Sequence, residues 1–280
     1  MREIHVSEII EAVRALCIEA NCSIGDDVMG ALDTALEIEE SEQGREAIRQ
    51  VIENNRIARD ALIPSCQDTG LAVVFVELGQ EVHIAGGLLY DAINEGVRRG
   101  YSEGYLRKSV VRDPLRRENT GDNTPAFIHL SLVPGDRLTI MVAPKGAGSE
   151  NMSRVAMLSP SAGEDGVKDF VVETVRLAGP NPCPPVVVGV GIGGAFEVAA
   201  FLAKRALLRP LGEKNREPFY ARMEDELLGM INDLGIGPQG FGGRVTALGV
   251  HIEVMPCHIA SLPVAVNLNC HASRHKTIVL

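Results

Sequence analysis

The chain has 280 residues, of which 45% are hydrophobic and 23% charged, a composition typical of a globular protein with one large domain or two smaller ones. Its formal net charge of −10 and its pI near 5.2 argue against nucleic acid or an anionic membrane as the main partner. No apolar run is suited to cross a membrane, and acidic residues interrupt the N-terminal segment where a signal peptide would be apolar, so we expect a cytoplasmic protein.

Residues 1–62 are expected to be helical. Ser7 is predicted to cap a first helix, because apolar residues recur behind it at helical spacing. A second helix is expected to open near Asp26, and a third to cover residues 42–62 and stop before a proline.

Strands and helices are expected to alternate beyond this helical part. The β-branched run 71–78 predicts a strand, and a helix is expected at about 86–99. The stretch 106–125 is too rich in Asn, Gly, Pro and charge to form a continuous element. Residues 126–143 predict a hairpin around Pro134-Gly135-Asp136.

The C-terminal half shows the same alternation after a polar, glycine-bearing loop at 144–153. Helices are expected at about 164–178, 194–207 and 217–234, and strands at VVVGVG (186–191), 244–254 and 262–268. The pattern predicts an α/β fold (mixed α+β), with a helical N-terminal part and two small sheets flanked by helices. We expect one domain over residues 1–280, either undivided or in two subdomains.

The six cysteines are expected to be reduced, because disulfides are rare in the cytosol. Cys17 lies on the apolar face of the first predicted helix and Cys22 near its end, so both are expected to pack in the core. Cys66, Cys183 and Cys270 instead lie on predicted loops beside Pro, Gly, Asn or Ser.

These three loop cysteines form no close pair of the C-x-x-C kind that zinc sites use, and they are far apart in the sequence. They can converge only through the fold, and spacing alone favours three unrelated loop cysteines. A cubane iron–sulfur cluster held by three cysteines would leave one iron without a protein ligand, free to act as a Lewis acid.

The residues around the cysteines decide between these readings. The segments PSCQDTG (64–70), RENTGDNTP (117–125), PKGAGSEN (144–151), GPNPCPP, VGVGIGG and MPCHIASLPVAVNLNCHASR (255–274) stand in this order along the chain. Together they resemble the class I, iron–sulfur-dependent fumarate hydratases and the related L-tartrate dehydratases. More narrowly, nearly the whole chain is similar to the α subunit of the two-subunit form.

The resemblance implies a hydro-lyase that reversibly hydrates fumarate to L-malate, a step of the tricarboxylic acid cycle. It implies that Cys66, Cys183 and Cys270 hold three irons of a [4Fe-4S] cluster, whose fourth iron binds the substrate hydroxyl and one carboxylate oxygen. L-tartrate dehydratase, with the same cluster, is the alternative that the sequence leaves open.

Residue-by-residue matching implies further roles. Gln67 and Asp68 fall where the family contacts the bound acid, and Asp68 would orient or polarise the hydroxyl as a catalytic residue. Arg107 matches a carboxylate-binding arginine, whose planar fork of donors suits that task. The role of Asn123 stays open between support of the site and turn formation, and that of His271 between donation to cluster sulfur and capping of a loop.

Two later segments complete the implied substrate site. The loop around Gly146 and Gly148 would present backbone N–H groups close to the substrate, since glycine permits close approach. His258 matches a histidine that touches the substrate carboxylate. Its neighbour Cys257 has no role in the family and is expected to be a packed thiol.

Some parts of the family's active site have no counterpart here. The threonine base and further carboxylate-binding arginine and lysine residues belong to a second domain of the family, whereas this chain ends at RHKTIVL. The resemblance therefore implies a separate β subunit and an α2β2 assembly. A dianionic substrate is repelled by a chain of charge −10, so the site needs a local concentration of positive charge. The basic stretch 107–117 is a candidate for it.

Other classes of protein remain as alternatives: a non-catalytic iron–sulfur protein, and a zinc-binding or nucleotide-binding α/β protein. GVGIGG (189–194) satisfies G-x-G-x-x-G, but a dinucleotide site also needs an acidic residue about 20 positions on, at the end of a strand. Glu213 lies in a turn-like segment instead. The glycines are therefore expected to allow tight packing of a strand against a helix, and NAD binding is not expected.

Overall fold

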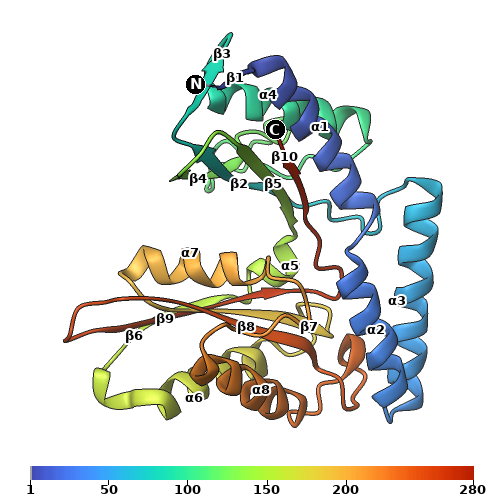
Figure 1. Ribbon diagram of the computed structural model, residues 1–280. Helices are drawn as coiled ribbons and strands as arrows, with labels where there is room; N and C mark the ends of the chain where they lie inside the picture. Colours follow the sequence, from blue (N-terminus) through green and yellow to red (C-terminus); the bar gives the residue numbers. More distant parts are fainter. Residues whose placement is uncertain (1) are drawn as a thin grey trace. The chain divides into compact units, whose positions relative to one another are not determined.

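The computed structural model describes residues 2–280, which form two compact units (Figure 1). Unit 1 contains residues 2–24, 54–147 and 274–280, and unit 2 contains residues 25–53 and 148–273. Each unit is therefore built from segments that are far apart in the sequence. The predicted mixed α/β fold is confirmed, with a four-stranded sheet in each unit and a two-stranded sheet in addition.

The three N-terminal helices are divided between the units. They are α1 (Val6–Cys22), α2 (Asp26–Ile38) and α3 (Glu42–Ala61), close to the predicted bounds. Helix α1 belongs to unit 1, α2 to unit 2, and α3 contributes to both. No helix in the described part of the chain is both long and apolar enough for a membrane crossing.

The cap of α1 differs from the prediction. The N-cap is His5, whose Nδ1 accepts a hydrogen bond from the Ser7 backbone N–H at 3.3 Å, while the Glu8 carboxylate accepts from the His5 backbone N–H at 3.2 Å. The prediction that Ser7 caps this helix is wrong. The reason is that strand β1 (Arg2–His5) ends in extended backbone at His5, which leaves Ser7 inside the first turn.

The sheet of unit 1 has the strand order β10-β5-β2-β4, with bounds Lys276–Val279, Leu138–Lys145, Leu71–Gly79 and Phe127–Val133. Strand β2 pairs parallel to β4 and antiparallel to β5, so it lies between them. The predicted hairpin 126–143 is therefore wrong. Strand β2 consists almost entirely of apolar residues, three of them valine, and such a strand is most stable with a partner on each side.

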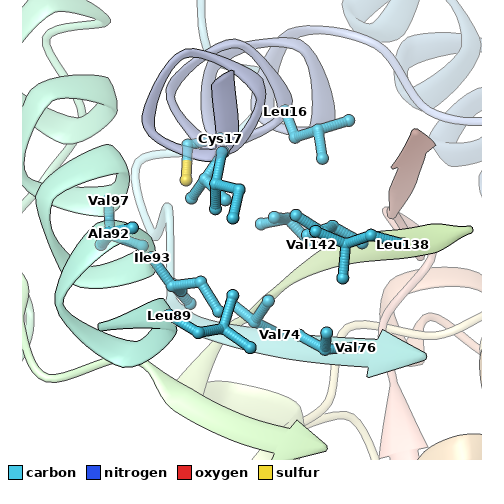
Figure 2. Packing of buried hydrophobic residues seen from close by; sticks show 14 of the residues in the cluster. Leu16, Cys17, Val74, Val76, Leu89, Ala92, Ile93, Val97, Leu138 and Val142 are labelled. Atoms are coloured by element: carbon cyan, nitrogen blue, oxygen red, sulfur yellow. The ribbon is translucent and has the colours of Figure 1, made fainter. Parts of the chain in front are cut away.

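Helices α1 and α4 (Leu89–Glu103) pack on one face of this sheet (Figure 1). Figure 2 shows Cys17 of α1 among apolar side chains of α4, β2 and β5. Burial raises the pKa of the Cys17 thiol to about 12, so it stays protonated and serves the core, as predicted. Strand β1 pairs parallel to β3 (Val82–Ala85) in the small sheet.

The sheet of unit 2 has the order β6-β9-β7-β8, with bounds Arg154–Leu158, Leu262–Asn269, Val186–Gly193 and Ala247–Met255. Helix α7 (Phe196–Ala206) covers one face, and α6 (Gly163–Ala178) and α8 (Pro218–Asn232) cover the other (Figure 1). Strand β6 was not predicted, nor was the one-turn helix α5 (Ala147–Glu150). Two 3-10 turns, Pro160–Ala162 and Pro238–Gly240, complete the described elements.

The glycines of β7 allow α7 to approach closely, as the sequence predicts. A Cβ atom added to Gly189 would lie 2.1 Å from the Ala203 carbonyl oxygen, and one added to Gly191 would lie 2.1 Å from the Ala199 carbonyl oxygen. These distances are far below van der Waals contact, and the atoms approached are backbone atoms of α7, which cannot move without displacing the helix. The G-x-G-x-x-G pattern thus has a packing explanation.

Replacing Gly191 by alanine is therefore expected to lower the free energy of unfolding by about 3 kcal/mol, the upper end of overpacking costs. Gly229 in α8 is the matched control, since a Cβ added there meets nothing within 4 Å. Gly229→Ala should raise stability by up to about 1 kcal/mol through helix propensity. Urea unfolding of both variants measures the difference; equal stabilities would contradict the close α7–β7 packing.

His251 of β8 is a buried, neutral histidine. Its side chain is 3% exposed, and Nδ1 lies 3.2 Å from the Ala206 carbonyl oxygen. Burial, and to a smaller extent the nearby Arg209 guanidinium, lower its pKa to about 4, against smaller raising effects of the Ala206 hydrogen bond and of Asp27.

This depressed pKa predicts a pH dependence of stability. The unfolded chain binds a proton at His251 below pH 6.5, whereas the folded chain does so only near pH 4. Stability therefore falls as pH drops through this window, by about 2 kcal/mol between pH 7 and pH 5. Urea unfolding of wild type and of His251→Gln at both pH values tests this: the dependence should be smaller in the variant by that amount, and an unchanged dependence would disprove it.

Candidate functional site

The segment 64–70, PSCQDTG, connects α3 to β2 and is here called the cysteine loop. The Cys66 Sγ atom accepts a hydrogen bond from the Asp68 backbone N–H at 3.4 Å and donates to Gln67 Oε1 at 3.5 Å. Cys66 is half-buried and Gln67 is exposed.

The Asp68 carboxylate bridges the cysteine loop and the start of the predicted glycine loop. Its Oδ1 accepts from the Gly70 N–H at 3.1 Å and its Oδ2 from the Ala147 N–H at 2.8 Å. A Cβ atom added to Gly146 would lie 3.1 Å from Asp68 Oδ2, so glycine allows this approach. The structure thus brings Asp68 and Gly146 together within unit 1, whereas Gly148 is the first residue of the next segment of unit 2.

Buried side chains hold the end of the cysteine loop. The Tyr101 hydroxyl donates to the carbonyl oxygens of Thr69 at 2.8 Å and Gly70 at 3.1 Å. Asn123 Nδ2 donates to the Gly70 carbonyl at 3.2 Å. Gly70 has φ +71°, and a Cβ there would lie 2.6 Å from the Lys145 backbone, so only glycine fits. No sequence motif singles out Tyr101, because an isolated tyrosine in a helix has many possible partners.

Asn123 also organises the stretch 106–125. Its Oδ1 accepts from the Ser109 N–H at 2.6 Å and from the Val110 N–H at 3.2 Å, and its side chain is fully buried. Its φ of 62° is left-handed, which asparagine tolerates in turns. Asn123 thus supports the end of the cysteine loop through its hydrogen bond to the Gly70 carbonyl.

Arg107 begins a basic stretch that is tied to the cysteine loop, since the Thr69 hydroxyl donates to the Arg107 carbonyl at 3.0 Å. The stretch carries five cationic side chains, none of them buried: Arg107, Lys108, Arg112, Arg116 and Arg117. Within residues 2–280, no carboxylate lies within 4.0 Å of their side-chain nitrogens. The stretch thus carries unneutralised positive charge, and the backbone of its first residue is bonded to the loop of Cys66.

Arg274 is a residue that sequence reasoning missed. It is 6% exposed, and its Nη2 donates to the Asp68 carbonyl at 2.6 Å and its Nη1 to the Ser65 hydroxyl at 3.4 Å. The sequence feature that could have drawn attention to it is its place in NCHASR, four residues after Cys270 and directly after two small residues.

Cys183 and the segment after Cys270 lie together in unit 2. The His271 backbone N–H donates to the Cys183 carbonyl at 3.3 Å. Cys183 is exposed, and its φ of 55° is left-handed, a strained conformation for a residue with a side chain. Its N–H donates to the Pro180 carbonyl at 3.0 Å, which fixes the turn that precedes β7. Cys270 is half-buried.

His258 lies on an exposed loop of unit 2 that follows β8. Its Nδ1 accepts from the Ala260 N–H at 3.1 Å, and its carbonyl accepts from the Ser261 N–H at 2.9 Å. Cys257 is exposed as well, and its thiol donates to the Ser261 carbonyl at 3.3 Å. The expectation that Cys257 is a packed thiol is therefore wrong, because this loop has no core around it.

The predicted cluster ligands are divided between the units: Cys66 belongs to unit 1, and Cys183 and Cys270 belong to unit 2. In the chain from residue 2 to residue 280, no three His, Cys, Asp or Glu side chains form a ready metal-binding group. The donor chemistry nevertheless fits a thiolate-bound group. All three are loop cysteines outside the apolar core and outside any disulfide, whereas Cys17 is buried in the core.

Comparison with known proteins decides the family. The profile of the family described as fumarate hydratase (fumerase) matches residues 10–279. The chain belongs to the fumarate hydratase family. The resemblance read from the motifs is thereby confirmed.

Several curated relatives of this fumarate hydratase family member bear another name. A protein of Methanocaldococcus jannaschii, provisionally named L(+)-tartrate dehydratase subunit alpha, is 46% identical over 274 residues, 95% of each chain. The L(+)-tartrate dehydratase subunit alpha of Escherichia coli O157:H7 is 34% identical over 279 residues, 98% of this chain and 91% of that one. That of Escherichia coli strain UTI89 is 35% identical over 277 residues, with the same shares. The names of the family and of the relatives all describe hydro-lyases, so they share the lyase class. The substrates that they name differ: fumarate for the family and L(+)-tartrate for the relatives.

Proposed function

We propose that this chain is the α subunit of a [4Fe-4S]-dependent hydro-lyase that reversibly hydrates fumarate to L-malate. The observation that carries the proposal is the family match over residues 10–279, which includes all three loop cysteines. L(+)-tartrate dehydratase is the second candidate, favoured by the names of the relatives at 34–46% identity.

Cys66, Cys183 and Cys270 would hold the cluster. The His271–Cys183 hydrogen bond supports a common site for two of them. Cys270 directly precedes His271 in the motif NCHASR, and Cys66 stands in PSCQDTG; both motifs lie within the residues that the family profile matches.

When bound, such a cluster supplies one iron without a protein ligand, which acts as a Lewis acid toward the hydroxyl that leaves. The chain's own residues would bind and orient the dicarboxylate. Asp68, held by two backbone N–H groups, would orient the hydroxyl, and Gln67 would bind the acid beside it. Arg107 would pair with a substrate carboxylate, and His258 would add a further donor.

The basic stretch 107–117 would attract the dianionic substrate. The stretch carries five unneutralised cationic side chains, and its backbone is bonded to the cysteine loop through the Thr69–Arg107 hydrogen bond. Local positive charge raises the concentration of an anionic substrate even when the net charge of the chain is negative. The backbone N–H groups around Gly146 and Gly148 would add uncharged donors to the same substrate.

A separate β subunit would complete the site. The relatives are named subunit alpha, and the chain covers 91–95% of their length, which supports a partner chain in this protein as well. That subunit would provide the catalytic base and further carboxylate-binding residues. An α2β2 assembly, with the α subunits as a dimer, is part of the proposal.

The test is anaerobic reconstitution of the chain with iron and sulfide, followed by metal analysis and spectroscopy with and without L-malate. We expect a cubane cluster whose spectrum changes with malate, and hydration of fumarate only when the β subunit is present. A chain that takes up no cluster would refute the proposal, and zinc in its place would favour another class. Faster turnover of L-tartrate than of malate would favour the second candidate.

A further inference from the structure

Arg274 is a buried cation without a nearby anion. Its side chain is 6% exposed, and among the described residues no carboxylate lies within 4.0 Å of it. Its hydrogen bonds go to two neutral acceptors of the cysteine loop, the Asp68 carbonyl and the Ser65 hydroxyl, and its buried Nε has no hydrogen-bond partner.

The neighbouring groups do not supply the missing negative charge. The Asp68 carboxylate is bound to the Gly70 and Ala147 N–H groups instead. Burial raises the pKa of the Cys22 thiol, against a smaller lowering effect of Arg274, and burial also raises the pKa of Tyr101. Both side chains therefore stay protonated and neutral.

A buried charge without a counterion is costly, and proteins rarely keep one unless a bound group neutralises it. The loop that Arg274 contacts carries Cys66. Three thiolates outweigh the positive charge of an oxidised cubane core, so a cluster bound there is an anion. Nearby charge and hydrogen bonding are among the factors that set the reduction potential of such clusters.

We propose that Arg274 is a positioning residue for the cluster: it holds the Ser65–Asp68 segment in its binding conformation and offsets the negative charge of the cluster that Cys66 binds. This inference rests on the proposed function and adds to it a residue outside the substrate contacts. Arginine suits the task because two of its nitrogens can bond different atoms of the loop, and because its guanidinium group is always charged in proteins.

Three variants of the full chain separate the two parts of this role. Arg274→Gln removes the charge and the fork, Arg274→Lys keeps the charge but loses the fork, and Tyr101→Phe removes the hydroxyl bonds to Thr69 and Gly70 without changing any charge. Each is measured by amide hydrogen exchange of residues 65–70 in the cluster-free chain, and by the midpoint potential of the cluster after anaerobic reconstitution.

Both Arg274 variants should speed exchange in this segment by about tenfold, since hydrogen bonds from a charged donor are lost or weakened. The potential should become more negative in Arg274→Gln only, because removing a positive charge makes reduction harder. Tyr101→Phe should speed exchange and leave the potential unchanged. If Arg274→Gln does not fold, Arg274→Lys decides: faster exchange with an unchanged potential supports the inference, and unchanged exchange overturns it.

A loaded Arg274→Gln chain with the wild-type potential would overturn the inference and leave the proposed function intact. Wild-type chain that takes up no cluster would overturn both. A shift of potential as large in Tyr101→Phe as in Arg274→Gln would assign the effect to loop order alone, and the electrostatic role would be wrong.

Discussion

Replacing Cys183 by serine is expected to abolish stable cluster binding and to lower fumarate hydration by the α–β complex by at least about 100-fold. Loss of groups that merely support metal ligands already costs 10- to 100-fold, and a lost ligand costs more. The serine hydroxyl is a poor substitute, because iron–sulfur clusters are held by thiolates. Iron and sulfide per chain after anaerobic reconstitution measure the binding, and initial rates measure the activity.

Cys257→Ser is the matched control. Cys257 is also exposed on a loop of unit 2, and its thiol donates to the Ser261 carbonyl oxygen, which a serine hydroxyl can also reach. This variant should keep the wild-type iron content and activity. Wild-type iron in Cys183→Ser, or an equal loss in Cys257→Ser, would remove Cys183 from the ligand set.

Replacing Asp68 by asparagine is expected to lower kcat by about 10²- to 10⁴-fold, the usual range for a lost acid–base or orienting group. The amide keeps one acceptor oxygen, so either the Gly70 or the Ala147 N–H loses its partner. Because one such hydrogen bond to a charged group is worth about 1.5–3 kcal/mol, the fold should survive. Cluster content should stay near wild type, since Asp68 is not a predicted ligand.

Steady-state rates with fumarate and malate, iron content, and urea unfolding test this prediction together. Asp60→Asn is the control on exposed helix surface, and it should leave all three unchanged, since its ion pair with Arg59 at 3.5 Å is solvent-exposed. A variant Asp68→Asn with wild-type kcat would show that this carboxylate only ties the two loops together.

The local patterns of the sequence predicted most helices and strands because their information lies within a few residues. Helix α3 is predicted almost to the residue, since its apolar spacing and the proline behind it are both local. The packing role of Cys17 and of the β7 glycines could be predicted for the same reason. Strand partners cannot be predicted in this way, because pairing depends on residues distant in the sequence.

The candidate site shows the same division. Cys66, Cys183 and Cys270 could be chosen from their motifs, because their neighbours are characteristic of the family. Tyr101 and Arg274 could not, since neither stands in a motif with an assigned role and each acts on the cysteine loop from another segment. The helix cap at His5 was missed because it depends on strand β1 and its partner β3.

The sequence by itself therefore determined the family, the types of most elements and the residues that are candidates for binding and catalysis, because motifs and periodicity are properties of short segments. Tertiary structure alone decided that β2 separates β4 from β5, that each unit combines distant segments, and that a buried arginine lies against the loop of Cys66. The physical reason is that these features arise from burial and hydrogen bonding between residues far apart in the chain, whose free energy no local pattern records.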